Sequence, residues 1–409
     1  MIFLTGIFSL CFFNFASAYS SPNVYVTQLN VSEINSDEIK GDFVIWNSED
    51  YFLNDLNYSI QLLQGTGLNQ QKTIDTQVVA ENFFVAPGQK ITKKFDYKYP
   101  QNIDSGKYIL RIQPVDNRGG LLSWEDKTIS LDGKNNFLKI VSPLKLSING
   151  NENPPTTGET ASATDKITAV LTIKNPGNEI TATPTVKVYN RMYNMSLAKE
   201  FNAPEITFAK GETKEIEIDM PKLETPESYL AEVKLFLGND QISPIQYFRW
   251  VVAGESGKIL SVKSDKDYYA AGENIVVTVD SVGPADGSDA GTATLQVNVY
   301  DGKGNLSASV SKEVKLNSYV SSSKISIANK KDLVSPKFEV KLIKDGKVLD
   351  RQGVNLPLFS DQAKRLQKKV EITKIVSGCV LVFIILVALV LVYIFRKKIF
   401  FFKLWKKGN

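Results

Sequence analysis

Apolar and polar side chains alternate along most of the chain between residues 19 and 359, and this period of two constrains the fold more than any other feature. Residues 91–97 and 214–218 show the alternation clearly. Successive side chains of a β-strand face opposite sides, so such segments indicate half-buried strands. They are rich in Val, Ile, Thr and Tyr and are separated by Gly, Pro, Asn and Asp. No long amphipathic helix is expected before residue 360, and we predict an all-β fold.

A longer pattern repeats three times. Each time a Gly or Pro turn is followed by a strand that begins near an aromatic residue, then by a second turn and a last strand; the aromatic residues are Tyr108, Tyr229 and Phe338. Their spacing suits seven-stranded sandwiches of roughly 100 residues. Tyr108 and Tyr229 are candidates for a tyrosine corner, whose hydroxyl fixes the start of the strand. Trp124 and Trp250 lie in the predicted last strands and are expected to belong to the cores.

These repeats predict three tandem immunoglobulin-like β-sandwich domains, over 19–137, 138–254 and 255–359. Residues 169–178, with 186–189, resemble the cell-adhesion-related bacterial domain, an immunoglobulin-like sandwich found in tandem on bacterial and archaeal surface proteins. A weaker match lies at 43–47 and 58–60. Residues 264–273 are similar to the opening of macroglobulin-type domains. The resemblance implies display, adhesion or spacing, because fold alone does not fix function.

The two ends of the chain predict export and anchoring. Residues 2–15 are almost entirely apolar and Ala16-Ser17-Ala18 follows, which predicts a signal peptide over 1–18. Residues 375–395 carry no charge and are long enough for one transmembrane helix of about 31 Å. A charged juxtamembrane helix is expected over 360–374.

The last segment, 396–409, is predicted to be a basic cytoplasmic tail. Basic residues flank the span on both sides almost equally, so the orientation depends on the signal peptide, which sends the long N-terminal part outside. The tail is expected to contact membrane lipid, through the basic and aromatic flank Arg396, Lys397, Lys398, Lys403, Trp405, Lys406 and Lys407. The terminal lysine pair leaves endoplasmic-reticulum residence open as an alternative if the host is a eukaryote.

Composition excludes several kinds of activity. The chain has no histidine, which rules out Ser-His-Asp hydrolysis and histidine-ligated metals. Its net charge of +4 comes from the membrane-flanking segments, so the displayed part is mildly acidic and nucleic-acid binding is not expected. The two cysteines, Cys11 and Cys379, lie in the leader and in the span, so no disulfide is expected in the exported domains.

Specific sites are few. Asp280, Asp286 and Asp289 lie in a Gly-rich stretch and are weak candidates for calcium, which prefers clustered oxygen ligands. Loop aspartates more often stabilise turns. No catalytic residue or cofactor is predicted. A hydrolase that uses two carboxylates remains open, but no motif supports it.

We therefore expect a non-enzymatic, membrane-anchored surface protein that holds its domains in an elongated rod. Its ligand is expected to be an extracellular protein or a glycan that the sequence does not identify. The alternative is an accessory subunit of a membrane complex that acts through its helix and its displayed domains. Small residues at 377–379 would allow close helix packing in that case.

Overall fold

The computed structural model describes residues 24–65, 71–115, 122–190 and 196–356. The predicted signal peptide, juxtamembrane helix, transmembrane helix and tail lie outside these residues. No helix within the described ranges is long and apolar enough to cross a membrane.

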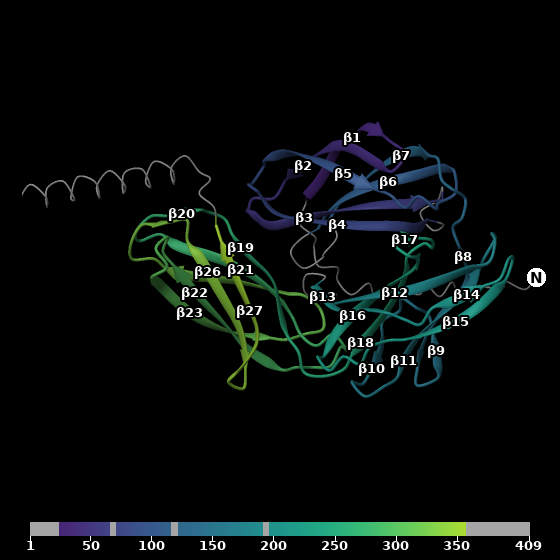
Figure 1. The fold of residues 1–409 in the computed structure, drawn as a ribbon. Coiled ribbons are helices and arrows are strands. Elements are labelled where there is room, and N and C mark those ends of the chain that lie inside the picture. The colour runs from purple at the N-terminus through teal and green to yellow at the C-terminus, as the bar shows by residue number, and fades with distance from the viewer. Residues whose placement is uncertain (1–23, 66–70, 116–121, 191–195, 357–409) are drawn as a thin grey trace, which may run out of the picture.

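The described chain is all-β, as the alternation predicts, and its strands group into three units (Figure 1). The first unit contains β1 (Val24–Ile34), β2 (Glu38–Asn47), β3 (Leu53–Gln64), β4 (Lys72–Val85), β5 (Lys90–Lys98), β6 (Gly106–Val115) and β7 (Glu125–Leu131). The second unit contains β8 (Lys139–Ile148), β9 (Asn151–Asn153), β10 (Glu159–Ala161), β11 (Ile167–Lys174), β12 (Ile180–Asn190), β13 (Ser196–Asn202), β14 (Ile206–Phe208), β15 (Thr213–Asp219), β16 (Glu227–Leu237), β17 (Asp240–Gln241) and β18 (Gln246–Val252). The third unit contains β19 (Lys258–Ser264), β20 (Tyr268–Tyr269), β21 (Asn274–Val282), β22 (Thr292–Tyr300), β23 (Leu306–Lys315), β24 (Ser321–Ala328), β25 (Leu333–Val334), β26 (Lys337–Lys344) and β27 (Lys347–Asn355).

Each unit pairs two main sheets around a buried core. The sheets run β1-β2-β5 and β4-β3-β6-β7 in the first unit, β15-β11-β8-β9 and β10-β18-β16-β12-β13 in the second, and β19-β21-β24 and β23-β22-β26-β27 in the third. Neighbouring strands are antiparallel, except that β10 runs parallel to β18. This layering is consistent with immunoglobulin-like sandwiches.

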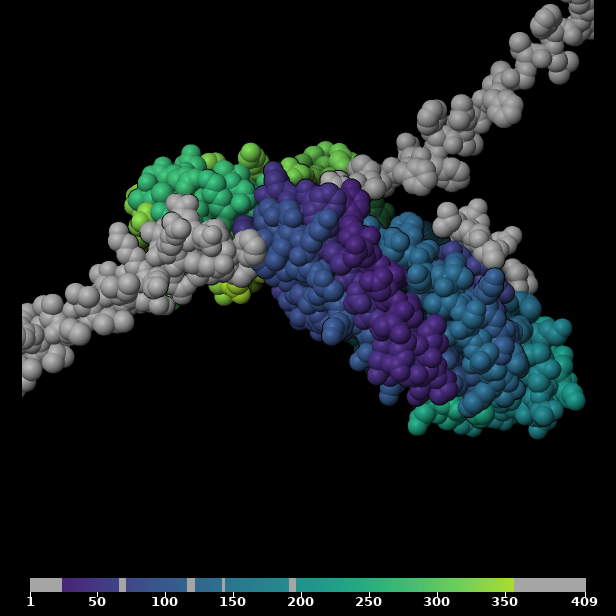
Figure 2. Space-filling view, turned by 90° about the horizontal axis from the view of Figure 1, so that it is seen from above, coloured from purple at the N-terminus to yellow at the C-terminus, as the bar shows by residue number. Residues whose placement is uncertain are grey.

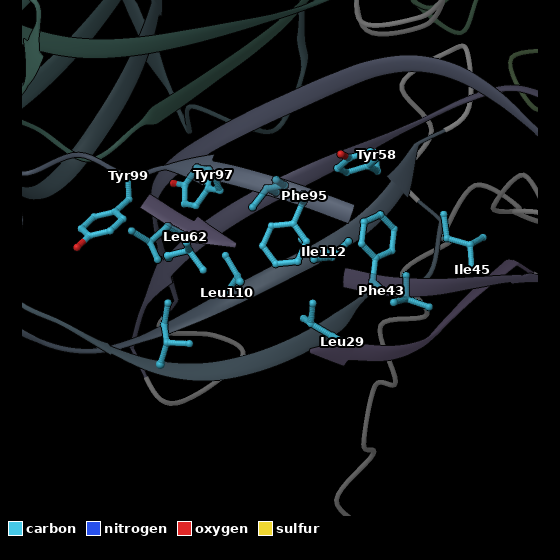
Figure 3. Packing of buried hydrophobic residues seen from close by; sticks show 14 of the residues in the cluster. Leu29, Phe43, Ile45, Tyr58, Leu62, Phe95, Tyr97, Tyr99, Leu110 and Ile112 are labelled. Carbon is cyan, nitrogen blue, oxygen red and sulfur yellow. The ribbon is translucent and has the colours of Figure 1, made fainter. Parts of the chain in front are cut away.

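The first unit shows how the alternation builds a core (Figure 3). Phe43 on β2 points inward, as do the residues two positions before and after it. Its ring packs in an edge-to-face arrangement with Tyr58 of the opposite sheet, with 4.9 Å between the ring centroids. Phe43 is fully buried, and burying such a side chain stabilises a fold by about 1.5–3 kcal/mol. No disulfide is needed where a core of this size forms.

An asparagine holds a turn in the same way in every unit. In the second unit, the Asn175 side-chain nitrogen lies 2.7, 3.2 and 3.0 Å from the backbone oxygens of Asn178, Phe208 and Ala209. Its side-chain oxygen accepts a hydrogen bond from the backbone nitrogen of Gly177. Asn175 is only 3% exposed, so it fixes the end of β11 against the turn before β15.

The equivalent residues are Asn47 in the first unit and Asn329 in the third. Asn47 donates to the backbone oxygens of Val85 and Ala86, and Asn329 donates to those of Tyr269 and Ala270. Each asparagine meets a four-residue turn that begins with alanine and ends with Gln or Glu, whose side chain accepts from the alanine N–H; these turns are 86–89, 209–212 and 270–273.

In the third unit, the asparagine and the turn occur in the reverse order along the chain. In the first two units the asparagine comes before the turn along the chain, whereas in the third the turn precedes β21 and Asn329 follows β24. The strand pair itself is antiparallel in all three units. The same local structure is therefore reached through a different connection.

The elongated rod expected from the sequence is wrong. The first unit packs on both of the others, and in Figure 2 its purple-to-blue surface lies between the teal second unit and the green third unit. Phe52 and Ala86 of the first unit belong to the buried cluster of the third. Hydrogen bonds join β4 to the second unit at the same time. The three units therefore pack together as one compact particle.

Candidate functional site

The second unit meets the first along β4, through polar groups. The Asp75 carboxylate pairs with the Lys234 ammonium at 2.8 Å and accepts a hydrogen bond from the Tyr97 hydroxyl at 3.1 Å. Both charged side chains are less than a fifth exposed. The attraction between two charges shielded in this way is stronger than at the surface, but the cost of removing them from water offsets part of that gain.

Backbone groups strengthen this first–second joint. Gln241 donates from its side chain to the backbone oxygen of Ile74 at 2.7 Å, and the Ile245 N–H donates to the backbone oxygen of Thr73 at 3.1 Å. Beside them, burial raises the pKa of Glu232, although the Lys234 charge opposes that effect. The joint is thus a specific hydrogen-bonded contact that contains one carboxyl group whose pKa is raised by burial.

The first–third joint is apolar. The rings of Phe52 and Phe84 stack at 5.4 Å between centroids, and Phe52 is only 8% exposed although it lies outside the core of its own unit. Next to them, the Lys263 ammonium lies 5.0 Å from the Tyr51 ring centroid. Apolar burial and a cation–π contact together hold the first unit against the third.

The second–third joint contains a buried carboxyl group. The Glu227 side chain is 1% exposed, and its Oε2 lies 3.8 Å from the Lys258 ammonium of the third unit. Burial raises the pKa of Glu227 to about 7, although the Lys258 charge and a hydrogen bond from the Asn190 amide pull it down. Burial also lowers the pKa of Lys258.

The linker at this joint is held closely. Gly254 has a φ of +143°, and a Cβ at this position would lie 2.5 Å from Cγ of Pro226. Its N–H donates to Asp286 of the third unit at 3.0 Å. An ion pair between Glu255 and Lys344 follows directly. The linker is therefore fixed to both units that it connects.

The two tyrosines singled out from the sequence do what a tyrosine corner requires. The hydroxyl of Tyr108 donates to the backbone oxygen of Asp104 at 2.6 Å, and that of Tyr229 donates to Thr225 at 2.9 Å. Phe338 is fully buried at the equivalent place and has no hydroxyl. Trp250 is fully buried and stacks on Tyr229 at 5.8 Å between centroids.

Trp124 corrects the sequence prediction. It was expected in the core of the first unit, but it lies just before β7 and is 50% exposed. Its ring packs against the Arg111 guanidinium at 5.0 Å, on the outer face of the sheet. A tryptophan at this position can remain outside because the guanidinium covers part of its surface.

The three calcium candidates each have a different partner. Asp280 pairs with Lys263 at 2.8 Å, Asp286 accepts from Gly254 and Ser288, and Asp289 accepts from the N–H of Gly291. Within the described ranges, no group of three or more His, Cys, Asp or Glu residues could hold a metal ion. The tail residues singled out from the sequence lie beyond the last described residue.

Sequence reasoning missed the cluster of Glu227, Lys258 and Asn190. These residues come from β16, β19 and β12 and are separated by more than thirty positions from one another, so no motif or periodicity unites them. The sequence offered one signal for this cluster, namely polar residues at inward-facing positions of otherwise apolar strands. That signal is weak, because such residues are common at strand ends.

Comparison with known proteins gives distant structural likenesses. No protein-family model matches the chain, and no curated protein matches it. Trypsin-activated alpha-2-macroglobulin from Escherichia coli is similar at 11% identity and a TM-score of 0.32, over 84% of this chain and 24% of that one. Red sea bream transglutaminase is similar at 11% identity and a TM-score of 0.25, over 54% of this chain and 32% of that one.

The FN1–FN3 domains of chicken CNTN1 are similar at 12% identity and a TM-score of 0.17, over 80% of this chain and 97% of that one. This chain spans a third or less of the macroglobulin and transglutaminase chains that it matches. The fold assignment therefore rests on the sheets and cores described above. The resemblance to the cell-adhesion-related bacterial domain stays a prediction.

Proposed function

We propose that the chain is a membrane-anchored cell-surface protein that displays three tandem immunoglobulin-like sandwiches as one compact particle, for adhesion, ligand binding or spacing, without enzymatic activity. The observation that carries the proposal is the uncharged stretch 375–395, which follows closely after the last core residue of the third unit, Leu356. A stretch of this length is sufficient for one membrane crossing.

The joints support a role in display. Polar, apolar and charged contacts hold the units together, so a ligand-binding face on the first unit would keep a fixed position relative to the other two units. Contacts that restrict domain motion reduce the entropy lost when a ligand binds. A surface protein that positions a partner benefits from such a rigid particle.

The anchor is tested with the full-length chain carrying an epitope at its C-terminus. We expect it to remain in the membrane after alkaline carbonate extraction, and external protease to remove the three units while the tail epitope survives. A variant with Leu386→Arg and Leu389→Arg should be released, because each arginine costs about 2.5–3.5 kcal/mol at the centre of a span. Leu386→Ala with Leu389→Ala is the matched control. Extraction of the unmodified chain, or loss of its tail epitope, would refute the anchoring or its direction.

The displayed function is tested by binding. Full-length protein in detergent would be screened on arrays of glycans and of surface proteins from the host. Saturable binding that survives a change of the helix to poly-Leu supports display. Partners that are lost with the poly-Leu helix would instead favour the accessory subunit, whose small residues at 377–379 favour close helix contact.

A further inference from the structure

The outer face of the sheet β1-β2-β5 points away from the other two units (Figures 1 and 2). The contacts that join the first unit to its neighbours come instead from β4 and from loops at Tyr51, Ala86 and Asn102. Figure 2 shows the purple strand β1 running across the exposed surface of the first unit. A ligand can therefore reach this face while the three units stay together.

Three side chains form a row across this face, which we call the aromatic row. Tyr25 of β1 lies opposite Trp46 of β2, and Trp46 lies opposite Lys90 of β5. The two rings are 5.6 Å apart between centroids and are tilted by 35°, and the Lys90 ammonium lies 5.4 Å from the Trp46 ring centroid. The row faces outward because its strand neighbours Val24 and Ile45 are buried in the core. Tyr25 is 41% exposed.

The next two rows of the same face are mostly polar, and we call them the polar rows. They consist of Gln28, Val44 and Thr92, and then of Asn30, Asp42 and Lys94. The Asn30 amide donates to the Asp42 carboxylate at 3.1 Å, which holds both groups in place. Amide, hydroxyl and carboxylate groups can pair with hydroxyls as donors or acceptors. The face thus places two aromatic rings beside a set of hydrogen-bonding groups.

A sugar ring matches this combination of groups. A pyranose has a face of C–H groups and a rim of hydroxyls. The C–H groups carry a slight positive charge and are attracted to the negative face of an aromatic ring, while the hydroxyls pair with amides and carboxylates. A protein partner would instead need a larger apolar centre than two rings and one valine provide.

The charge of β5 further defines the ligand. Lys90, Lys94 and Lys98 are exposed and project from β5 on this face. None of the three forms an ion pair with another described residue. Asp96, the one acid between them on this side of β5, lies opposite Lys40 in the sheet. A carboxylate on the ligand would supply a counter-ion for these lysines.

We propose that the aromatic row and the polar rows form a binding site for an acidic saccharide, in which a sugar ring carries a carboxylate. The C–H face of that sugar lies against the rings of Tyr25 and Trp46, and its carboxylate pairs with Lys90. Hydroxyls of this sugar and of the next one along the glycan pair with the polar rows. The site rests on the proposed display function, since it is the ligand-binding face that such a protein would present.

The test is binding of the full-length protein in detergent to immobilised acidic oligosaccharides. The probes are tri-galacturonate, a hyaluronan oligosaccharide and sialyllactose, each beside its methyl ester, which removes the charge and keeps the sugar. We expect saturable binding of at least one acid, about tenfold tighter than its ester. Equal binding of acid and ester, or no binding of any acid, overturns the proposal.

Variants of the aromatic row test the place of binding. Tyr25→Ala should weaken binding of the acid by about tenfold, whereas Tyr25→Phe keeps the ring and should keep most of the affinity. Trp124→Ala is the matched control, because Trp124 is 50% exposed and lies beside a different sheet. Thermal melts confirm that each variant is folded. Full affinity in Tyr25→Ala, or an equal loss in Trp124→Ala, overturns the site.

Variants of Lys90 test the role of the charge. Lys90→Gln should remove most of the preference for the acid over its ester, and Lys90→Arg should keep it. Raised salt should weaken binding of the acid to the unmodified protein more than to Lys90→Gln. Lys303→Gln, at an exposed position of the third unit, is the control and should behave like the unmodified protein. An unchanged preference in Lys90→Gln overturns the pairing with the carboxylate.

Failure of this site can be told apart from failure of the proposed function. The anchor is measured by carbonate extraction, which does not depend on any saccharide. If the protein binds a surface protein saturably but none of the acids, display stands and this site is overturned. If an acid binds through the aromatic row but the chain is extracted from the membrane, the site stands and the anchoring is refuted.

Discussion

Replacing Asn175 by alanine is the most direct test of how these units are held together. Asn175 fixes the end of β11 against the turn before β15, and its side chain contacts three backbone oxygens from two segments. Alanine removes all of these hydrogen bonds and leaves the strand pair itself intact. The effect should therefore be local to the second unit.

The magnitude follows from what each oxygen loses. The oxygen of Phe208 is buried at its contact with Asn175, so its loss should cost about 1–3 kcal/mol. The oxygen of Ala209 still accepts from the Glu212 N–H, and Asn178 is exposed and can turn to water, so each of these should cost about 0.5–1 kcal/mol. We expect a total loss of about 2–5 kcal/mol.

Aspartate at the same position separates hydrogen bonding from shape. Asn175→Asp keeps the oxygen that accepts from Gly177, but it turns a negative charge toward three carbonyl oxygens. At neutral pH it should be more damaging than alanine, since an uncompensated buried charge is costly. In mild acid the protonated carboxyl can donate once, so part of the stability should return.

Hydrogen exchange followed by mass spectrometry reports on each unit separately. In Asn175→Ala, the amides of β11 and β15 should exchange faster by the factor that corresponds to the expected loss of stability. The amides of the first and third units should keep their protection. Asn202→Ala, which removes a single exposed contact with Thr185, is the control and should change protection by less than about 0.5 kcal/mol. A loss in Asn175→Ala no larger than in the control would refute the reasoning.

Three further predictions concern the joints. Phe52→Ala should loosen the first–third joint and increase the radius of gyration in small-angle scattering. Tyr319→Ala, at a 53% exposed position, should leave the radius of gyration unchanged. An equal radius of gyration for both variants would refute the role of the stacked rings. Gly254→Ala should lower the thermal midpoint more than Gly238→Ala. Both glycines have positive φ, but only at Gly254 would a Cβ meet Pro226. Equal shifts of the midpoint would show that the close approach to Pro226 is not the cause. Burial raises the pKa of Glu232 above its ordinary value of 4.5, so above that pH the folded protein binds more protons than the unfolded chain. Stability should therefore fall as pH rises from there to the raised pKa. Thermal melts of Glu232→Gln that show the same pH slope would contradict this.

The local structure of this protein was largely determined by its sequence. Alternation at residues 91–97 and 214–218 predicted strands that became β5 and β15, because the period of two sets which side chains can be buried. The aromatic residues at the strand starts were also informative, since Tyr108 and Tyr229 bind backbone oxygens only four residues away. Such short-range relations are visible in a single sequence.

Long-range contacts were decided only by the tertiary structure. Trp124 fits a core pattern but is 50% exposed, with its ring packed against Arg111. Phe52 belongs to the first unit and is buried by the third, so no local sequence pattern could show that the units pack into a compact particle. Asn190, Glu227 and Lys258 meet for the same reason: strand pairing and unit packing bring together residues that are distant in the chain, and neither follows from the period of two.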